Sequence, residues 1–112
     1  MSYNKNSIAD KIGSGYNSLD RNLVAKWNSI RDILRTKYVT TEMSVNTVAA
    51  ERYKFDLYGL FLNEFNIPTI QIYPHMIVNG YMSSYDYYGE LLRFKIIDGN
   101  ILRQYHRLFT RE

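Results

Sequence analysis

Cysteine is absent from this chain of 112 residues, and histidine occurs only twice, as His75 and His106. The first absence excludes a disulfide framework, a thiolate nucleophile and a thiolate zinc site. A zinc site requires three or four His, Cys or carboxylate ligands, and no cluster with that spacing stands out. We therefore expect no metal and no other cofactor. His75 is predicted to be a solvated or capping imidazole, and the neighbouring arginines disfavour protonation of His106.

Motifs of catalysis and phosphate binding are missing as well. The chain contains no GxGxxG, GxxxxGK[ST], HExxH or GxSxG pattern, and the GSG segment at 13–15 is typical of a turn. Asp86 with Glu90, and Asp56 with Glu64, leave a carboxylate pair of the glycosidase kind open, because such pairs are assembled in three dimensions. Solvated carboxylates are the commoner case, so we expect no catalytic residues and a protein that is not an enzyme.

Long apolar runs are also lacking. The longest near-apolar run is Leu57–Leu62, far short of the roughly 20 residues that span a bilayer, and residues 1–18 lack the apolar segment of a secretory signal. With 46% apolar and 22% charged residues, the composition is that of a globular domain. We expect one soluble domain, made inside the cell, with no membrane span.

The net charge is small, at +3. Residues 1–40 hold seven Lys and Arg against three acids, and residues 41–112 hold seven against eight. A basic N-terminal third permits contact with nucleic acid, but the excess is modest, so that partner is possible and not favoured.

Two helices are predicted in the N-terminal half. Residues 1–17 are expected to form a flexible arm and residues 18–112 a single domain. The first helix runs from the N-cap Ser18 to about residue 38, with an apolar stripe at Leu23, Trp27, Ile30 and Leu34.

The second helix is expected at about 48–65. Gly59 lies in its middle, where the missing side chain leaves room for a close neighbour. Asn66 suits the left-handed position after the helix, and Pro68 prevents continuation.

A small antiparallel sheet is predicted next. Residues 69–73 alternate as a half-buried strand does, and Asn79-Gly80 is the strongest short signal for a type I′ hairpin turn, leading into a return strand at 81–82. Residues 91–97 form a further strand, residues 39–47 a loop or edge strand, and residues 101–109 a short C-terminal helix. The fold class is therefore α+β: two N-terminal helices, a small antiparallel sheet with an Asn-Gly hairpin, and a short C-terminal helix.

Two features are candidate interaction sites. The loop at 83–89 and its approach are dense in tyrosine on an acidic background, which suits a protein interface better than stacking on nucleic acid. On the C-terminal helix, arginines at i, i+4 and i+8 form a basic stripe that suits phosphates or an acidic partner, although a solvated helix face is the commoner case. The interface candidates are Tyr81, Tyr85, Tyr87, Tyr88, Arg103, Arg107 and Arg111.

The segment Arg52–Pro68 carries a resemblance. Its Tyr58-Gly59 pair, followed by aromatic and aliphatic residues, Asn66 and Pro68, resembles a segment of small bacteriophage tail proteins. It is most similar to the baseplate wedge proteins with a LysM-like module, in which a helix ending in Tyr-Gly leads to an Asn and a Pro-containing turn. The resemblance implies a virion structural part present in multiple copies, with no catalytic residues.

The leading hypothesis is therefore a structural subunit of a bacteriophage virion, in the tail, baseplate or neck, assembled in the host cytoplasm. Its partners would be other virion structural proteins. The alternative is a small phage-encoded protein that binds nucleic acid or regulates the host, supported by the basic N-terminal third and the arginine stripe. An enzyme with a hidden carboxylate site is the third possibility.

Overall fold

The computed structural model describes residues 21–111. The predicted arm at 1–17 and the predicted helix start at Ser18 lie outside these residues. Within them, six α-helices and a two-stranded antiparallel sheet confirm the α+β class. The elements are α2 (Arg21–Ser29), α3 (Arg31–Lys37), β1 (Val39–Ser44), α4 (Thr47–Arg52), α5 (Leu57–Glu64), α6 (Ile72–Val78), β2 (Arg93–Ile97) and α7 (Gly99–Thr110), with short 3-10 turns η1 (Thr69–Gln71) and η2 (Ser84–Asp86).

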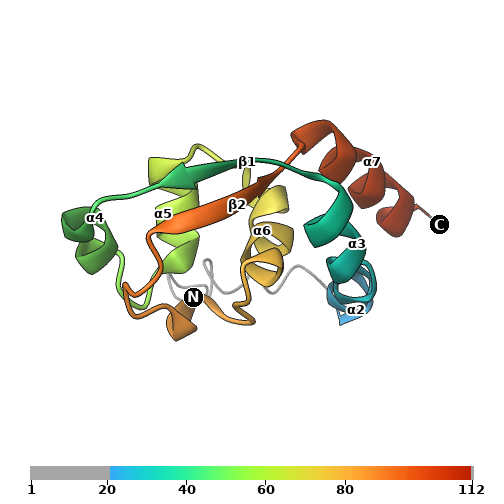
Figure 1. The fold of residues 1–112 in the computed structure, drawn as a ribbon. Helices are drawn as coiled ribbons and strands as arrows, with labels where there is room; N and C mark the ends of the chain where they lie inside the picture. Colours follow the sequence, from blue (N-terminus) through green and yellow to red (C-terminus); the bar gives the residue numbers. More distant parts are fainter. Residues whose placement is uncertain (1–20, 112) are drawn as a thin grey trace.

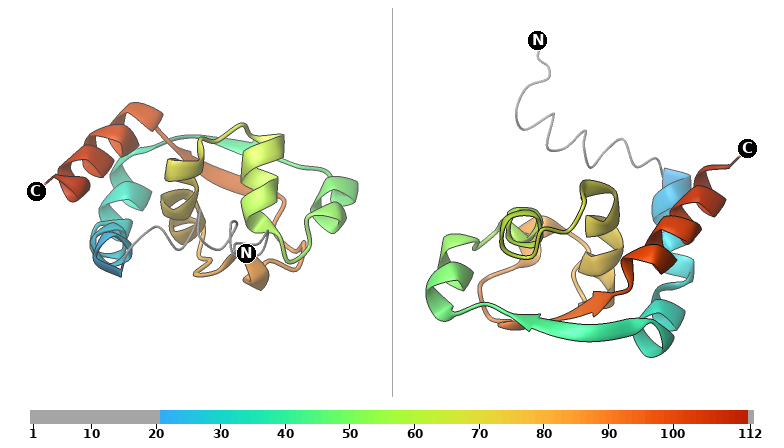
Figure 2. Two further views of the ribbon diagram at one scale, coloured as in Figure 1. Left: turned by 180° about the vertical axis from the view of Figure 1, so that it is seen from behind. Right: turned by 90° about the horizontal axis from the view of Figure 1, so that it is seen from above.

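The sheet runs through the middle of the molecule, and the helices lie in three places around it (Figure 1, Figure 2). α5 and α6 lie on one side of the sheet, α4 lies beyond one end, and α2, α3 and α7 gather at the other end. β1 and β2 pair antiparallel, with Met43 opposite Phe94. Phe94 is fully buried, and its ring meets that of Phe61 on α5 at 5.4 Å between centroids, so the core lies on the α5–α6 side.

The first predicted helix is two helices. The backbone of Ile30 leaves the helical region (φ −110°, ψ 11°), and its N–H donates to the Trp27 carbonyl three residues back. The apolar stripe nevertheless serves as predicted, because Leu23, Trp27 and Leu34 are all buried.

The second predicted helix is also interrupted, between α4 and α5. Asp56 is the N-cap of α5, and its carboxylate accepts the N–H of Gly59 at 3.0 Å. A Cβ on Gly59 would lie 2.3 Å from that carboxylate. Gly59 therefore does make room for a close neighbour, but that neighbour is the capping Asp56 side chain and not another backbone or a bulky ring.

The Tyr58-Gly59 pair stands in the first turn of α5, whereas the resemblance to the baseplate proteins places such a pair at the end of a helix. The end of α5 is as predicted. Asn66 has φ 55°, and α5 stops four residues before Pro68.

The predicted hairpin at 69–82 is wrong, because residues 69–78 are helical. All seven residues of α6 are buried, so this helix has no wet face whose period identifies it from the sequence. Pro74 is tolerated because it lies in the first turn, where backbone N–H groups have no partner within the helix.

Asn79-Gly80 ends α6 and does not join two strands. Gly80 has φ 92°, and its N–H donates to the Ile77 carbonyl at 3.0 Å. The N–H of Tyr81 donates to the Met76 carbonyl, also at 3.0 Å. These two bonds form a Schellman motif, which requires a positive φ at its glycine just as a type I′ turn does. The Asn-Gly dipeptide, which predicted a hairpin turn, therefore forms the C-terminal cap of a helix.

Candidate functional site

The tyrosine-rich loop divides into buried and exposed rings. Tyr81 and Tyr87 are 8% and 0% exposed, so their prediction as interface residues is wrong for the chain in this form. The Tyr87 hydroxyl donates to the Leu91 carbonyl at 2.6 Å, and its ring meets those of Tyr81 and Phe94 at 5.7 and 5.8 Å between centroids. Both phenols belong to the core and anchor the loop.

Glu90 joins this anchor to the surface. One of its carboxylate oxygens accepts the Tyr81 hydroxyl, and the other accepts the Tyr88 N–H at 2.8 Å. Burial, followed by the bond to the Glu90 carboxylate, raises the pKa of Tyr81 well above its usual range. Partial burial alone would raise the pKa of Glu90, but hydrogen bonds from Tyr81 and from the N–H groups of Glu90 and Tyr88 lower it overall.

Tyr85 and Tyr88 are the exposed tyrosines, at 71% and 60%. Phe55, which the sequence analysis did not single out, is 47% exposed, and its ring meets that of Tyr88 edge to face at 5.2 Å. Ser84 accepts the Tyr58 N–H at 2.8 Å, which holds η2 beside the start of α5. We name Phe55, Tyr85 and Tyr88 the aromatic corner.

Phe55 is held in an unfavourable backbone conformation. Its φ is 64°, a left-handed value that costs a bulky residue about 1–2 kcal/mol. The N–H of Phe55 donates to the Tyr87 carbonyl at 2.7 Å, so the buried part of the loop keeps it there. The only sequence signal for Phe55 is an aromatic residue before the N-cap Asp56, a position that patterns of helix periodicity do not mark.

The surroundings of the aromatic corner are acidic. Residues 47–92 hold five Asp and Glu against two Lys and Arg. Both of those cations are paired within this end of the molecule: Lys54 lies 3.7 Å from Glu51, and Arg52 lies 3.8 Å from Glu64. Asp86, between the two exposed tyrosines in sequence, is exposed.

The arginine stripe lies at the opposite end of the molecule, on α7. Arg103, Arg107 and Arg111 are exposed, as predicted for the stripe. The Arg103 guanidinium donates to the Asn100 side chain on its own helix, and Arg103 lines neither of the two depressions on α7 described next.

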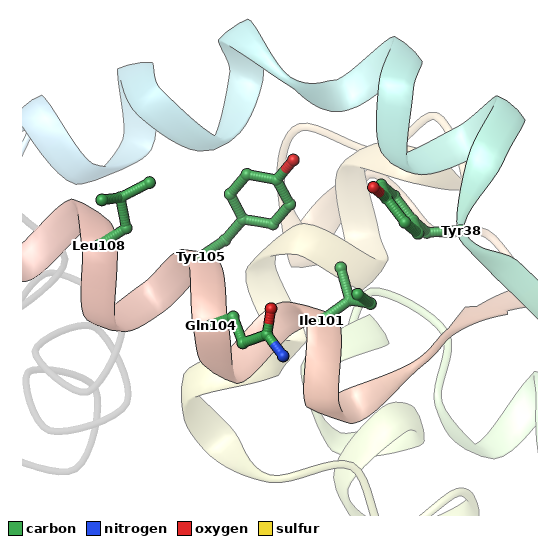
Figure 3. Close-up of a pocket in the computed structure, with 5 residues that line it drawn as sticks. All are labelled: Tyr38, Ile101, Gln104, Tyr105 and Leu108. Atoms are coloured by element: carbon green, nitrogen blue, oxygen red, sulfur yellow. The ribbon is translucent and has the colours of Figure 1, made fainter.

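Two depressions follow one face of α7. The larger, of about 530 Å³, is lined by Gln104, Arg107, Leu108 and Arg111, among the residues described. The smaller, of about 160 Å³, lies towards α3 and is lined by Tyr38, Ile101, Gln104, Tyr105 and Leu108 (Figure 3). Because Gln104 and Leu108 line both, they form one surface, which we name the α7 strip.

The α7 strip is firmly placed. Leu102 is fully buried, and the Phe109 ring meets the Trp27 ring edge to face at 5.0 Å. The Lys26 ammonium donates to the Phe109 carbonyl at 2.9 Å. Residues 21–37 and 99–111, which build this end, hold eight Lys and Arg against one Asp. The basic strip is therefore presented by a packed, strongly basic end of the molecule.

His75 has a structural role, and its prediction as a solvated imidazole is wrong. It is 1% exposed. Its Nε2 accepts the Ile97 N–H at 3.0 Å, which leaves Nδ1 to donate to the Gln71 carbonyl at 2.8 Å. Burial lowers its pKa and outweighs the opposing effect of the backbone hydrogen bonds.

Three of the four carboxylates considered for catalysis have structural partners, and the fourth, Asp86, is exposed. Asp56 caps α5, Glu64 pairs with Arg52, and Glu90 binds the Tyr81 hydroxyl. Across residues 21–111, no three His, Asp or Glu side chains are arranged to hold a metal ion. Over the same residues, no helix has the length and apolar character that crossing a bilayer requires.

Comparisons with protein-family models, with curated proteins and with solved structures found no match to the chain. The aromatic corner and the α7 strip are therefore the features from which a function can be inferred.

Proposed function

We propose that this chain is a structural subunit of a bacteriophage particle, in the tail, baseplate or neck, and that it acts through protein–protein contacts. The observation that carries the proposal is the aromatic corner. Its three aromatic residues are all exposed, and the rings of Phe55 and Tyr88 are in contact. Interfaces are enriched in such rings.

The corner is pre-organised for contact. Phe55 is kept in a left-handed conformation, and the loop behind it is tied to the core by Tyr87 and Glu90. A ring held rigidly before binding loses little conformational freedom when a partner docks. An aromatic residue exposed at a cost in backbone strain is better explained by a partner than by folding.

The phage context of the proposal comes from the resemblance at Arg52–Pro68, the segment that contains Phe55. In this proposal the chain resides in the virion, is assembled in the host cytoplasm, and contacts other virion structural proteins in multiple copies.

The test is to purify particles of the phage that encodes the chain on a density gradient and to quantify the chain by mass spectrometry against the other structural proteins. We expect a fixed whole-number stoichiometry that survives a high-salt wash. Presence of the chain in the infected cell, together with its absence from washed particles, would overturn the proposal.

A second candidate function is nucleic-acid binding by the basic end, because residues 21–37 and 99–111 hold eight Lys and Arg against one Asp. Its test is fluorescence anisotropy with labelled duplex DNA over a salt series. Phosphate contacts would give a steep, linear fall of log affinity with log salt, and absence of binding at low salt would exclude this function.

A further inference from the structure

We infer that the occupant of the α7 strip is the aromatic corner of a second copy of this chain, so that copies associate head to tail. This inference rests on the proposed function, in which the chain is present in multiple copies, and it names one of the partners.

Charge is the first argument. The acidic end, with α4, α5 and η2, and the basic end, with α2, α3 and α7, lie at opposite ends of the molecule (Figure 1, Figure 2). Residues 47–92, at the acidic end, hold five acids against two cations. The basic end, with the N-cap Asp98 of α7 included, holds eight cations against two acids. Such a separation attracts the unlike ends of two copies and repels the like ends, which fixes the orientation of the encounter.

Shape and side-chain chemistry are the second argument. The α7 strip is hollowed and has the exposed Leu108 at its middle, with Arg107 and Arg111 beside it. The aromatic corner exposes phenol and phenyl rings, and the next residue in sequence after Tyr85 is the exposed Asp86. Guanidinium groups stack on aromatic faces and form bidentate hydrogen bonds with carboxylates. Each surface therefore offers the groups that the other one prefers.

Position is the third argument. The two surfaces lie on opposite ends of a body 36 × 33 × 19 Å in extent, so one molecule cannot bring its own corner to its own strip. Docking between copies leaves one corner and one strip free at the two ends of every pair. Such a heterologous contact continues until a ring closes, or it continues as a filament.

The experiment uses two full-length variants, each with one surface disabled. Arg107→Glu with Arg111→Glu reverses the strip and keeps the corner. Tyr85→Ala with Asp86→Lys disables the corner and keeps the strip. Sedimentation velocity is measured for the wild type, for each variant alone and for an equimolar mixture, at about 20 mM and about 500 mM NaCl, because salt screens surface attraction.

We expect the wild type to form dimers and larger species at low salt and each variant to remain monomeric. The mixture should form a dimer and nothing larger, because only the corner of one variant can dock on the strip of the other. Arg103→Glu is the matched control: it makes the same charge change on the same helix but lies outside the α7 strip, so it should weaken association by less than Arg107→Glu does.

A wild type that stays monomeric at low salt and high concentration overturns the inference, as does a mixture of variants that does not associate. Equal effects of Arg103→Glu and Arg107→Glu also overturn it, because they would indicate attraction by net charge alone. A monomeric chain that is nevertheless recovered stoichiometrically in particles would contradict head-to-tail docking and leave the proposed function standing. Association of the copies in solution, together with absence of the chain from particles, would support head-to-tail docking and contradict the proposed function.

Discussion

The side-chain amide of Asn79 pairs with the backbone of Lys95 as a neighbouring strand would. Its Oδ1 accepts the Lys95 N–H at 2.8 Å, and its Nδ2 donates to the Lys95 carbonyl at 3.0 Å. One turn earlier on α6, His75 accepts the Ile97 N–H. Two side chains of a buried helix therefore satisfy the edge of β2 that β1 does not cover, an edge whose unpaired groups would otherwise be costly.

Asn79→Ala tests this pairing. The substitution removes both partners of the Lys95 backbone, and we expect the free energy of unfolding to fall by about 1–3 kcal/mol. Urea denaturation measures the change. Asn63→Ala, at an exposed position of α5, is the control and should stay within about 0.5 kcal/mol. Equal losses of unfolding free energy for Asn79→Ala and Asn63→Ala would show that the Asn79 amide does not stabilise the edge of β2.

His75 predicts how stability depends on pH. Its pKa is lowered in the folded protein, whereas in the unfolded chain it stays near 6.5. Above pH 6.5 the His75 ring is neutral in both the folded and the unfolded chain. As the pH falls below about 6.5, the unfolded chain takes up the proton first, so stability decreases until the lowered folded pKa is reached. One proton gives a slope of at most about 1.4 kcal/mol per pH unit.

The measurement is urea denaturation at a series of pH values between about 7 and 5, for the wild type and for His106→Ala. Both proteins should lose stability over this range. Retention of full stability by the wild type down to the acid end would contradict the buried, neutral form of His75.

Tyr85 and Tyr87, two residues apart in the same loop, should differ strongly in the stability lost on truncation. Tyr87 is fully buried and Tyr85 is exposed. Tyr87→Ala leaves a large cavity and an unpaired Leu91 carbonyl, so we expect a loss of about 3–5 kcal/mol, whereas Tyr85→Ala should cost less than about 0.5 kcal/mol. Thermal unfolding followed by circular dichroism compares them. Similar midpoints for the two variants would mean that the loop is not anchored as described.

Gly59→Ala should destabilise the protein through the Asp56 cap. An added Cβ meets the Asp56 carboxylate, and loss of an N-cap costs about 1 kcal/mol. In an Asp56→Ala background the cap is already absent, so the same Gly59→Ala change should be neutral or stabilising, because Ala favours helix by about 1 kcal/mol over Gly. A double-mutant cycle measured by urea denaturation gives the coupling, and additive effects would contradict the capping geometry.

The sequence correctly predicted the helices and strands that have one buried and one exposed face, because such elements show a periodic pattern of apolar residues. The stripe of Leu23, Trp27 and Leu34 has such faces and lies on the helices α2 and α3. The strand predicted at 91–97 also has them, and the structure has a strand at Arg93–Ile97. The region of α6 has no exposed face, since every residue is buried, so no helical period marks it. The alternation at 69–73 therefore indicated a strand where the chain is helical. Asn79-Gly80 correctly indicated a residue with positive φ, at Gly80, but the turn ends a helix and does not join two strands.

The candidate site divides in the same way. The exposed arginines follow from helical spacing alone. The burial of Tyr81 and Tyr87 depends on contacts with Phe94 and Glu90, which are made only when the chain folds. The position of Phe55 depends on a backbone hydrogen bond to Tyr87, 32 residues away in sequence. No local sequence pattern can therefore predict that Phe55 is exposed.

Phe55→Asn tests the central claim, that the aromatic corner exists for contact, most directly. Asn tolerates a left-handed backbone, so relief of strain should offset the lost contact with Tyr88, and the unfolding midpoint should stay nearly unchanged. The measurement is incorporation of Phe55→Asn into phage particles in competition with the wild-type chain, together with its unfolding midpoint. We expect a normally folded variant that is largely excluded from particles. Equal incorporation of the two chains would contradict the account.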